Sequence, residues 1–239
     1  MEINFSGKIV VVAGGTGGLG HAVSRAFLDE GATVVATYRK EEEFLALKQA
    51  CGATAERLEG AAVDVTDEHA ASEFVGRILS RHGRVDVLVN TVGGYAAGVK
   101  LWELETKVFD AMLALNLRSG YALSRAVLPA MLREKHGAIV NIAAKAAFDH
   151  GAGASAYAAS KAAAVAMMDS LAGDLKGTGV RVNSVLPSII DTEANRKAMP
   201  SADFSVWPKP EEIARVILFL CSDSASVVHG ATVPVYGNS

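Results

Sequence analysis

Tyr157 and Lys161 are the two side chains in this sequence whose types and spacing best suit proton transfer. The segment SAYAASKAAAVAMMDSLAGDL that holds them has a helical period, so residues four positions apart share one helix face. An ammonium group beside a phenol stabilises the phenolate and lowers the phenol pKa, which would make the phenol a usable proton donor near neutral pH. Because this spacing also arises by chance, a pair on the protein surface is the alternative interpretation.

A glycine-rich turn near the N-terminus could bring the backbone against a phosphate group. The stretch GGTGGLG, residues 14–20, follows the apolar run KIVVVA and precedes an amphipathic segment. A turn without side chains lets the backbone approach a pyrophosphate, and the following helix directs its positive end at the charge. The position of this turn between a strand and a helix favours a dinucleotide site over a merely flexible turn. The predicted cofactor-binding residues of the turn are Gly14, Gly15, Thr16, Gly17, Gly18 and Leu19.

The end of the second apolar run indicates which dinucleotide would be preferred. Tyr38 stands where an NAD-binding chain usually has a carboxylate for the ribose 2′-OH, and Arg39 and Lys40 follow it. A cation suits the 2′-phosphate of NADP. We predict that NADPH is preferred and that NADH is the alternative cofactor. The competing interpretation is that Arg39 and Lys40 only form a solvated entry to a helix.

The elements that would position these residues alternate between strands and helices along the chain. Runs rich in Val and Ile predict buried strands at 8–13, 33–38, 60–65, 84–90, 137–143, 180–186 and 230–236. Segments of helical period lie between them at 18–30, 41–51, 67–82, 103–118, 119–135, 155–176 and 210–222. This alternation predicts one α/β domain over residues 1–239, a doubly wound, mostly parallel sheet of seven strands with helices on both faces. The segment 188–209 has no clear period and follows the sixth strand, where it could act as a substrate lid.

Composition and charge exclude several other classes of protein. The formal net charge is −3 and there is no basic block, which disfavours binding to nucleic acid or to an anionic membrane surface. No apolar run reaches the roughly 18 residues that would span a bilayer, and the N-terminus does not resemble a secretory signal, so we expect a cytoplasmic protein. The two cysteines form no CxxC pair and the six histidines have no ligand spacing, so we expect no metal site.

The order of these motifs resembles that of the short-chain dehydrogenase/reductase family. The G-x-x-x-G-x-G turn is followed, at the distance found in that family, by the YxxxK helix, and the resemblance covers nearly the whole chain. It implies a Rossmann-like fold and an NAD(P)H-dependent oxidoreductase in which Tyr157 delivers a proton and Lys161 lowers the pKa of Tyr157 and holds the nicotinamide ribose. Asn116 would anchor a water molecule that resupplies the proton. Further cofactor-binding residues that the resemblance implies are Asp64, Val65, Asn90, Val92, Gly93, Pro187, Ile190 and Thr192.

The same resemblance implies a homodimer or a homotetramer. The helical segments 103–135 and 155–176 carry more Ala and Leu than one face of a sheet requires. Helices of this kind pair across a two-fold axis in the family. A small-molecule substrate and a second copy of the chain are therefore the expected partners.

Ala144 is the main departure from the family pattern. Thirteen residues before the tyrosine, family members carry a serine that hydrogen-bonds the substrate carbonyl, and this sequence has alanine there. Loss of one donor to developing negative charge typically costs about 10²- to 10³-fold in rate. The substrate therefore needs little polarisation, or another donor such as Lys145, Asp149 or His150 replaces the serine, or the chain has lost catalysis.

Two segments favour the first explanation, because they resemble the dihydropteridine reductases, which also have alanine at this position. They are AKAAFDHGAGASAYAASK (144–161) and NRKAMPSADFSVW (195–207). This resemblance implies a planar conjugated imine or carbonyl substrate such as a quinonoid dihydropterin, contacted by Ala144, Tyr95 and Trp207. For Tyr95 and Trp207, simple packing of a lid against the body is an equally good interpretation. The alternatives are a generic ketone, quinone or 3-oxoacyl reductase, and a non-catalytic regulator that binds a dinucleotide.

Overall fold

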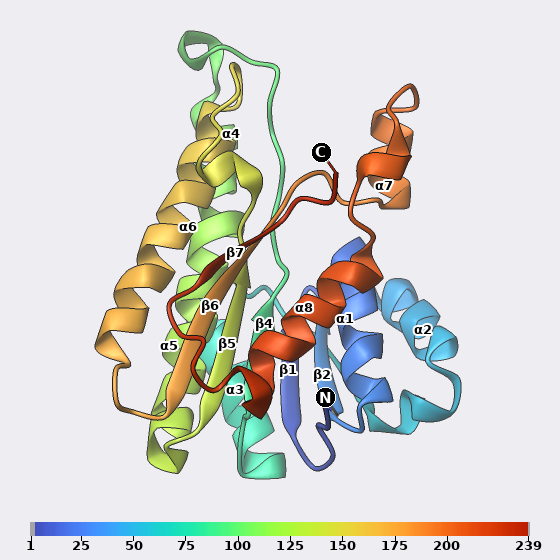
Figure 1. Cartoon of the computed structure of the whole chain (residues 1–239), viewed down its shortest axis with the longest axis vertical. Helices are drawn as coiled ribbons and strands as arrows, with labels where there is room; N and C mark the ends of the chain where they lie inside the picture. Colours follow the sequence, from blue (N-terminus) through green and yellow to red (C-terminus); the bar gives the residue numbers. More distant parts are fainter. Residues whose placement is uncertain (1–2, 239) are drawn as a thin grey trace.

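All the predicted strands assemble into one parallel sheet. In the computed structural model, which describes residues 3–238, seven strands lie in the order β3-β2-β1-β4-β5-β6-β7 and every neighbouring pair is parallel. The doubly wound, Rossmann-like α/β arrangement predicted from the sequence is confirmed (Figure 1). The strands are β1 (Ile9–Ala13), β2 (Thr33–Tyr38), β3 (Leu58–Ala62), β4 (Val87–Asn90), β5 (Gly137–Ile142), β6 (Val180–Pro187) and β7 (Thr232–Val235).

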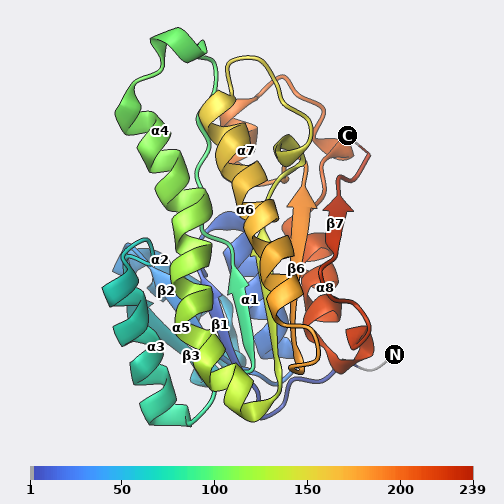
Figure 2. The same ribbon diagram turned by 90° about the vertical axis from the view of Figure 1, so that its left-hand side faces the viewer.

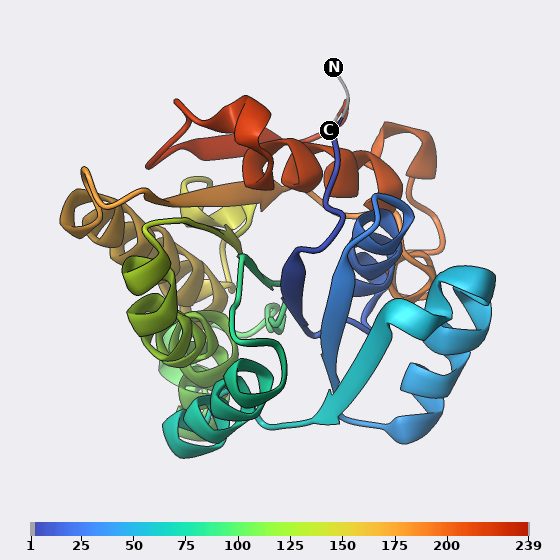
Figure 3. The same cartoon turned by 90° about the horizontal axis from the view of Figure 1, so that it is seen from below.

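Helices cover both faces of this sheet, as Figure 3 shows along the strands. Val10 and Val12 of β1 point to one face and pack in a core with three helices, whereas Val11 points to the opposite face and packs with three others. Burial on both faces explains why the first strand is an unbroken apolar run. On the first face lie α1 (Gly18–Asp29), α2 (Glu41–Ala50) and α8 (Pro210–Cys221), and on the second lie α3 (Glu68–His82), α5 (Ser119–Glu134) and α6 (Ser155–Asp174).

The third strand differs from its prediction. It was expected at 60–65 but runs from Leu58 to Ala62, which leaves Asp64 and Val65 in the loop that follows. The Asp64 carboxylate accepts hydrogen bonds from the backbone N–H and the hydroxyl of Thr66, at 2.9 and 2.7 Å. Such a local turn competes with strand pairing, and it ends the ladder before Asp64.

Two further segments depart from the predicted elements. The helix expected at 103–118 is α4 (Thr106–Leu113), preceded by a short 3₁₀ turn and followed by a π-helical turn, Ala114–Arg118, that leads into α5. α4 packs against α6 beyond the carboxyl ends of the strands (Figure 2). The segment 188–209 contains a short helix, α7 (Glu193–Ala198), which begins where the Thr192 hydroxyl accepts a hydrogen bond from the Asn195 N–H. Among residues 3–238, no helix combines the length and the apolar character needed to cross a bilayer.

The carboxyl ends of β1 and β4 form the point where the chain reverses its direction across the sheet. From β1 the chain proceeds to β2 and β3 on one side, and from β4 it proceeds to β5, β6 and β7 on the other. Ligands of open α/β sheets bind at such a point, because the connections on either side diverge and leave a crevice. The glycine turn follows β1 directly, and the helix after it is packed closely onto that turn.

We expect Gly20→Ala to destabilise the fold by about 2–4 kcal/mol. A Cβ atom at Gly20 would lie 2.0 Å from the carbonyl oxygen of Gly14, a contact that backbone movement must relieve. For a chain of this size, thermal unfolding should show a drop in Tm of roughly 5–15 °C.

Gly76→Ala is the matched control, because Gly76 also lies in a helix and a Cβ atom there would meet nothing within 4 Å. Its Tm should be unchanged or slightly higher, since alanine is the better helix former. An unchanged Tm in Gly20→Ala would contradict the close contact between α1 and the turn.

Candidate active site

The glycine turn presents bare backbone beside a cavity of about 240 Å³. Gly14 has a φ of +72°, which favours glycine, and its N–H donates a 2.9 Å hydrogen bond to the Thr37 hydroxyl on β2. The Thr91 hydroxyl donates to the Ala13 carbonyl at 2.7 Å and so ties the turn to β4. Residues in or next to the neighbouring strands therefore fix the conformation of the turn, and its backbone stays accessible from the cavity.

Eight of the predicted dinucleotide-binding residues meet at this cavity. Those that line it are Gly14, Thr16, Gly17, Arg39, Asp64, Val65, Val92 and Gly93. Gly15, Leu19 and Asn90 are buried behind the lining, where Gly15 leaves room for Ala36 and Asn90 donates to Ser119 and Asn141. Gly18 lies against Thr192, since a Cβ atom on Gly18 would be 2.8 Å from the Thr192 methyl carbon. The start of segment 188–209 therefore touches the glycine turn.

Charged side chains gather at the end of the cavity nearest β2. Arg39 is exposed there, and its charge adds to the hydrogen bonds from Thr66 in lowering the pKa of Asp64. Tyr38 lies beside it with its ring stacked on Phe44, at 5.0 Å between ring centroids. Glu43, which was not among the predicted site residues, lines the same cavity, and its carboxylate accepts a 3.2 Å hydrogen bond from the Thr16 hydroxyl. In the sequence, Glu43 stands in an acidic run that suits the first turn of any helix, so no signal singled it out.

Lys161 is buried at the other end of the site and makes one hydrogen bond. Its Nζ donates to the Ile142 carbonyl at the end of β5, at 2.9 Å. Burial disfavours the charged ammonium and lowers the pKa of Lys161 to about 8. The side chain is therefore cationic below that pH and neutral above it.

Tyr157 does not show the lowered pKa that was expected from its pairing with Lys161. Burial, together with Tyr95, raises the pKa of Tyr157 to about 12. The Tyr95 ring stands edge-on to the Tyr157 ring, with 4.9 Å between centroids and 78° between planes. Desolvation of the phenol is the larger of these two causes, so Tyr157 keeps its proton through the neutral range in the free protein.

Asn116 lies in the π-helical turn, and its side chain is fully engaged by the protein. Its Oδ1 accepts from the Gly94 N–H at 2.9 Å, while its Nδ2 donates to the Ser160 hydroxyl at 2.9 Å and to the Gly94 carbonyl. Single π-helical turns often mark functional sites, because they redirect a side chain within a helix. A water molecule held at Asn116 would therefore use its main chain rather than its amide.

Gly93 is the point where these groups converge. A Cβ atom there would lie 3.0 Å from Asn116 Oδ1 and 3.3 Å from Lys161 Nζ. Gly93 also lines the dinucleotide cavity. The structure thus brings Asn116 and Lys161 together at the cavity's edge, with Tyr157 one turn before Lys161 on α6.

The position of the missing serine is filled by a buried methyl group. Ala144 is buried at the end of β5 and precedes a 3₁₀ turn that packs against α6. Two of the suggested substitute donors are engaged elsewhere: His150 Nε2 contacts the Ala147 carbonyl at 3.1 Å, and Lys145 Nζ lies 5.3 Å from the centre of the Tyr236 ring. Asp149 is exposed on the same loop.

Trp207 lies in the packed base of segment 188–209 rather than on an open wall. Its side chain is only 6% exposed and its ring lies 5.0 Å from that of Phe204. Arg196 covers the other part of this cluster, because it lies over the Phe204 ring and pairs with the Asp191 carboxylate. Tyr95, by contrast, is 74% exposed. Of the two aromatic residues expected to contact substrate, only Tyr95 is exposed.

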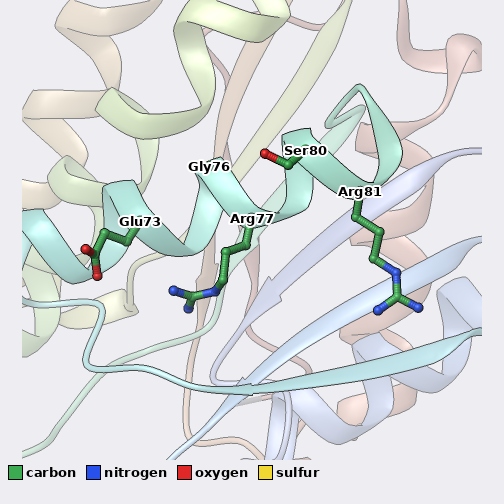
Figure 4. A pocket seen from close by; sticks show the side chains of 5 residues that line it. All are labelled: Glu73, Gly76, Arg77, Ser80 and Arg81. Atoms are coloured by element: carbon green, nitrogen blue, oxygen red, sulfur yellow. The ribbon is translucent and has the colours of Figure 1, made fainter.

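A second hollow lies away from this site, on the outer side of α3 (Figure 4). Its lining residues are all exposed side chains or backbone of one helix, and Arg81 is already paired with Glu59 at 3.3 Å. It has no buried polar group that would hold a ligand. No group of three or more His, Cys, Asp or Glu side chains within residues 3–238 is arranged to hold a metal ion.

We expect the Lys161 ammonium to titrate near pH 8, well below the ordinary lysine value of 10.5. NMR of protein labelled at lysine Cε should show one signal with this low midpoint, which Lys161→Met removes. A Lys161 signal that titrates near 10.5 would show that the ammonium is solvated rather than buried.

Comparisons with known proteins agree with this geometry. Residues 8–203 match the family model described as short chain dehydrogenase. The 3-oxoacyl-[acyl-carrier-protein] reductase FabG of Thermotoga maritima is 31% identical over 98% of this chain and 98% of its own length. The meso-2,3-butanediol dehydrogenase of Serratia marcescens is 34% identical, over 99% of this chain and 96% of its own. A solved structure titled "ElxO with NADP Bound" superposes with a TM-score of 0.91 at 27% identity, covering 96% of this chain and 97% of that one.

These relatives do not support the narrower resemblance to dihydropteridine reductase. They are named as reductases or dehydrogenases of other compounds. The match of the family model covers the glycine turn, the YxxxK helix and much of segment 188–209. The chain is an oxidoreductase that belongs to the short-chain dehydrogenase/reductase family.

Proposed function

We propose that this chain is an NADPH-preferring reductase of a carbonyl compound of the ketone, quinone or 3-oxoacyl class. The observation that carries the proposal is the convergence of Lys161 and Asn116 at Gly93, on the edge of the dinucleotide cavity and one helical turn from Tyr157. The names of the relatives support the substrate class, since one is a 3-oxoacyl reductase and another a butanediol dehydrogenase. The substrate is expected to lie beside Tyr95 and Ala144.

The residues present fit a dinucleotide. The glycine turn offers backbone N–H groups and the start of α1 to the pyrophosphate, and Asp64 and Val65 line the cavity where the adenine end would lie. Pro187, Ile190 and Thr192 lie at and after the end of β6 and would line the nicotinamide, as the family resemblance implies. When bound, the dinucleotide supplies the hydride. The Tyr157 hydroxyl then gives its proton to the substrate oxygen, and the cationic Lys161 stabilises the phenolate that remains. The Asn116 amide holds Gly94 and Ser160 in place. Its main chain would hold the water molecule through which Tyr157 regains a proton.

The cofactor preference rests on the residues at the end of β2. Arg39 and Lys40 place positive charge where a 2′-phosphate would lie, and Tyr38 offers no carboxylate to a ribose 2′-OH. Two solved structures of one relative, ElxO and a variant of it, are titled with NADP or NADPH bound. NADH remains the alternative cofactor.

The buried ammonium of Lys161 favours an enzyme over a dinucleotide-binding regulator. Burial of a charge that makes one hydrogen bond costs folding free energy. A protein that only binds a dinucleotide does not need a proton donor, so it gains nothing from a buried Lys161 ammonium placed with Asn116 near Gly93 and one helical turn from Tyr157.

Ala144 favours a second candidate substrate, a quinonoid dihydropterin. No hydroxyl stands at this position, and His150 and Lys145 are engaged elsewhere. A conjugated ring system can spread the negative charge that develops during hydride transfer. Its reduction therefore needs a proton donor more than it needs a further hydrogen-bond donor such as a serine hydroxyl. The named relatives do not support this substrate, so it stands second to the carbonyl class.

Two structural roles complete the proposal. The segment 188–209, which touches the glycine turn through Thr192, would close over bound substrate. Exposed apolar side chains on α4 and α5, namely Phe109, Tyr121 and Leu132, would be covered in a homodimer or homotetramer.

We expect Tyr157→Phe to lower kcat by about 10²- to 10⁴-fold, because the proton donor is lost, while the Kd for NADPH changes little. NADPH oxidation should be followed at 340 nm with ketones, quinones, 3-oxoacyl thioesters and quinonoid dihydropterin. Tyr95→Phe is the matched control, since it also removes one phenol hydroxyl from the same ring pair and should keep most of the activity. Full activity in Tyr157→Phe, or tight NADPH binding without turnover of any of these compounds, would refute the proposed function.

Ala144→Ser separates the two substrate classes. A restored hydroxyl should raise kcat/KM for a ketone by at least about tenfold, given what such a donor usually contributes, and leave dihydropterin reduction unchanged. If both rates stay as they were in the wild type, the serine position does not limit catalysis and the argument from Ala144 is wrong.

A further inference from the structure

The geometry points to Glu43 as a residue that determines cofactor specificity by weakening the binding of the 2′-phosphate. This inference rests on the proposed use of NADPH and deepens it. Arg39 and Lys40 favour a phosphate at this end of the cavity, whereas Glu43 places a carboxylate at the same place. The preference for NADPH is therefore weaker than Arg39 and Lys40 alone would make it.

The contacts of Glu43 hold its carboxylate at the cavity. Oε2 accepts a 3.2 Å hydrogen bond from the Thr16 hydroxyl in the glycine turn, and Oε1 lies 3.5 Å from Lys40 Nζ. The side chain thus bridges from the start of α2 to the turn that would bind the pyrophosphate. Its side chain is 43% exposed, compared with 65% for Lys40.

The neighbouring charges do not remove the effect of this carboxylate. The charged residues that line the cavity are Arg39, Glu43 and Asp64, and Lys40 joins them through its contact with Glu43. Lys40 directs part of its charge at Glu43, which leaves less for a phosphate. Asp64 is turned toward Thr66 by two hydrogen bonds, and its charge is further matched by Arg39. Of the acidic side chains that line this end of the cavity, Glu43 is therefore the one that contacts both the glycine turn, through Thr16, and Lys40, whose charge would otherwise favour a phosphate.

The two cofactors differ in how they would meet this group. A ribose 2′-OH can donate a hydrogen bond to a carboxylate, whereas a 2′-phosphate brings close to two negative charges near a third one. Across a partly solvated gap of several ångströms, such repulsion changes affinity by roughly three- to tenfold. It also takes Lys40 away from the phosphate. Both effects lower the affinity for NADPH and leave that for NADH nearly unchanged.

Glu43→Gln tests the inference, because it removes the charge and keeps the size and one hydrogen-bond acceptor. Kd values should be measured by titration calorimetry for NADPH and NADH, and for adenosine 2′,5′-bisphosphate and AMP as probes of the adenosine end. We expect Glu43→Gln to bind NADPH and the bisphosphate roughly three- to tenfold more tightly, with the Kd values for NADH and AMP within about twofold of the wild type.

Glu42→Gln is the matched control. It removes the same charge from the neighbouring position of α2, and Glu42 neither lines the cavity nor contacts Thr16 or Lys40 in the described structure. Its Kd values should equal those of the wild type within about twofold. Equal tightening in both variants would assign the effect to net charge and overturn the inference, and so would unchanged or weaker binding of NADPH by Glu43→Gln.

The experiment measures binding and needs no turnover, so it is independent of the proposed reaction. A wild type that binds NADH more tightly than NADPH would overturn the proposed preference. The role of Glu43 would still be decided by whether the ratio of the two Kd values shifts in Glu43→Gln.

Discussion

The close approach between the start of α1 and the turn after β1 is the constraint on which the rest of the site depends. At Gly20 the backbone comes so near to the Gly14 carbonyl that no side chain fits, and this contact aims the helix along the turn. Thr37 from β2 and Thr91 after β4 then fix the turn by hydrogen bonds to its backbone. Thr37 lies in a strand of the sheet and Thr91 directly follows one, so the fold itself orders the turn and forms the cavity. A ligand that binds there loses no affinity to the ordering of the turn.

A second constraint is the burial of Lys161 at the other end of the cavity. Its bond to the Ile142 carbonyl joins α6 to the end of β5, and its pKa falls because the ammonium leaves water. The burial of the Tyr157 side chain raises the pKa of its phenol. The pair is thus arranged with a protonated phenol and an ammonium that holds its charge only below about pH 8. In the reduction that we propose, Tyr157 donates its proton and Lys161 must be charged, so neutral conditions are favoured over alkaline ones.

The sequence predicted those parts of the molecule whose patterns have one physical cause. Buried parallel strands need apolar residues on both faces, so the runs at β1 and β2 located the sheet, and the glycines located the turn. It could not predict Glu43, since an acidic first turn suits every helix whether or not the helix borders a cavity. The predicted end of β3 was wrong because the Asp64 carboxylate accepts hydrogen bonds from Thr66, and this local turn competes with strand pairing. The apolar run alone does not show at which residue such a turn ends the strand. The sequence could not predict the burial of Trp207 either, since no local pattern reveals that Trp207 packs against Phe204 or that the neighbouring Val206 carbonyl accepts a hydrogen bond from the distant Asn238 N–H.

The base of segment 188–209 explains why a likeness in that segment does not identify a substrate. Arg196 pairs with Asp191 and covers Phe204, whose ring packs against Trp207, and the Asn238 N–H donates to the Val206 carbonyl. The residues of NRKAMPSADFSVW that stand out in the sequence are thus used to fold the segment onto the body. Two proteins could share them because they share this packing and still reduce different compounds. The substrate class must instead be argued from the proposed catalytic groups, and the main feature there is that Ala144 offers a methyl group where family members carry a serine hydroxyl. Ala144 is therefore the position at which a carbonyl substrate and a conjugated ring substrate differ most in what they require of the site, because only the carbonyl depends on a further hydrogen-bond donor to its developing negative charge.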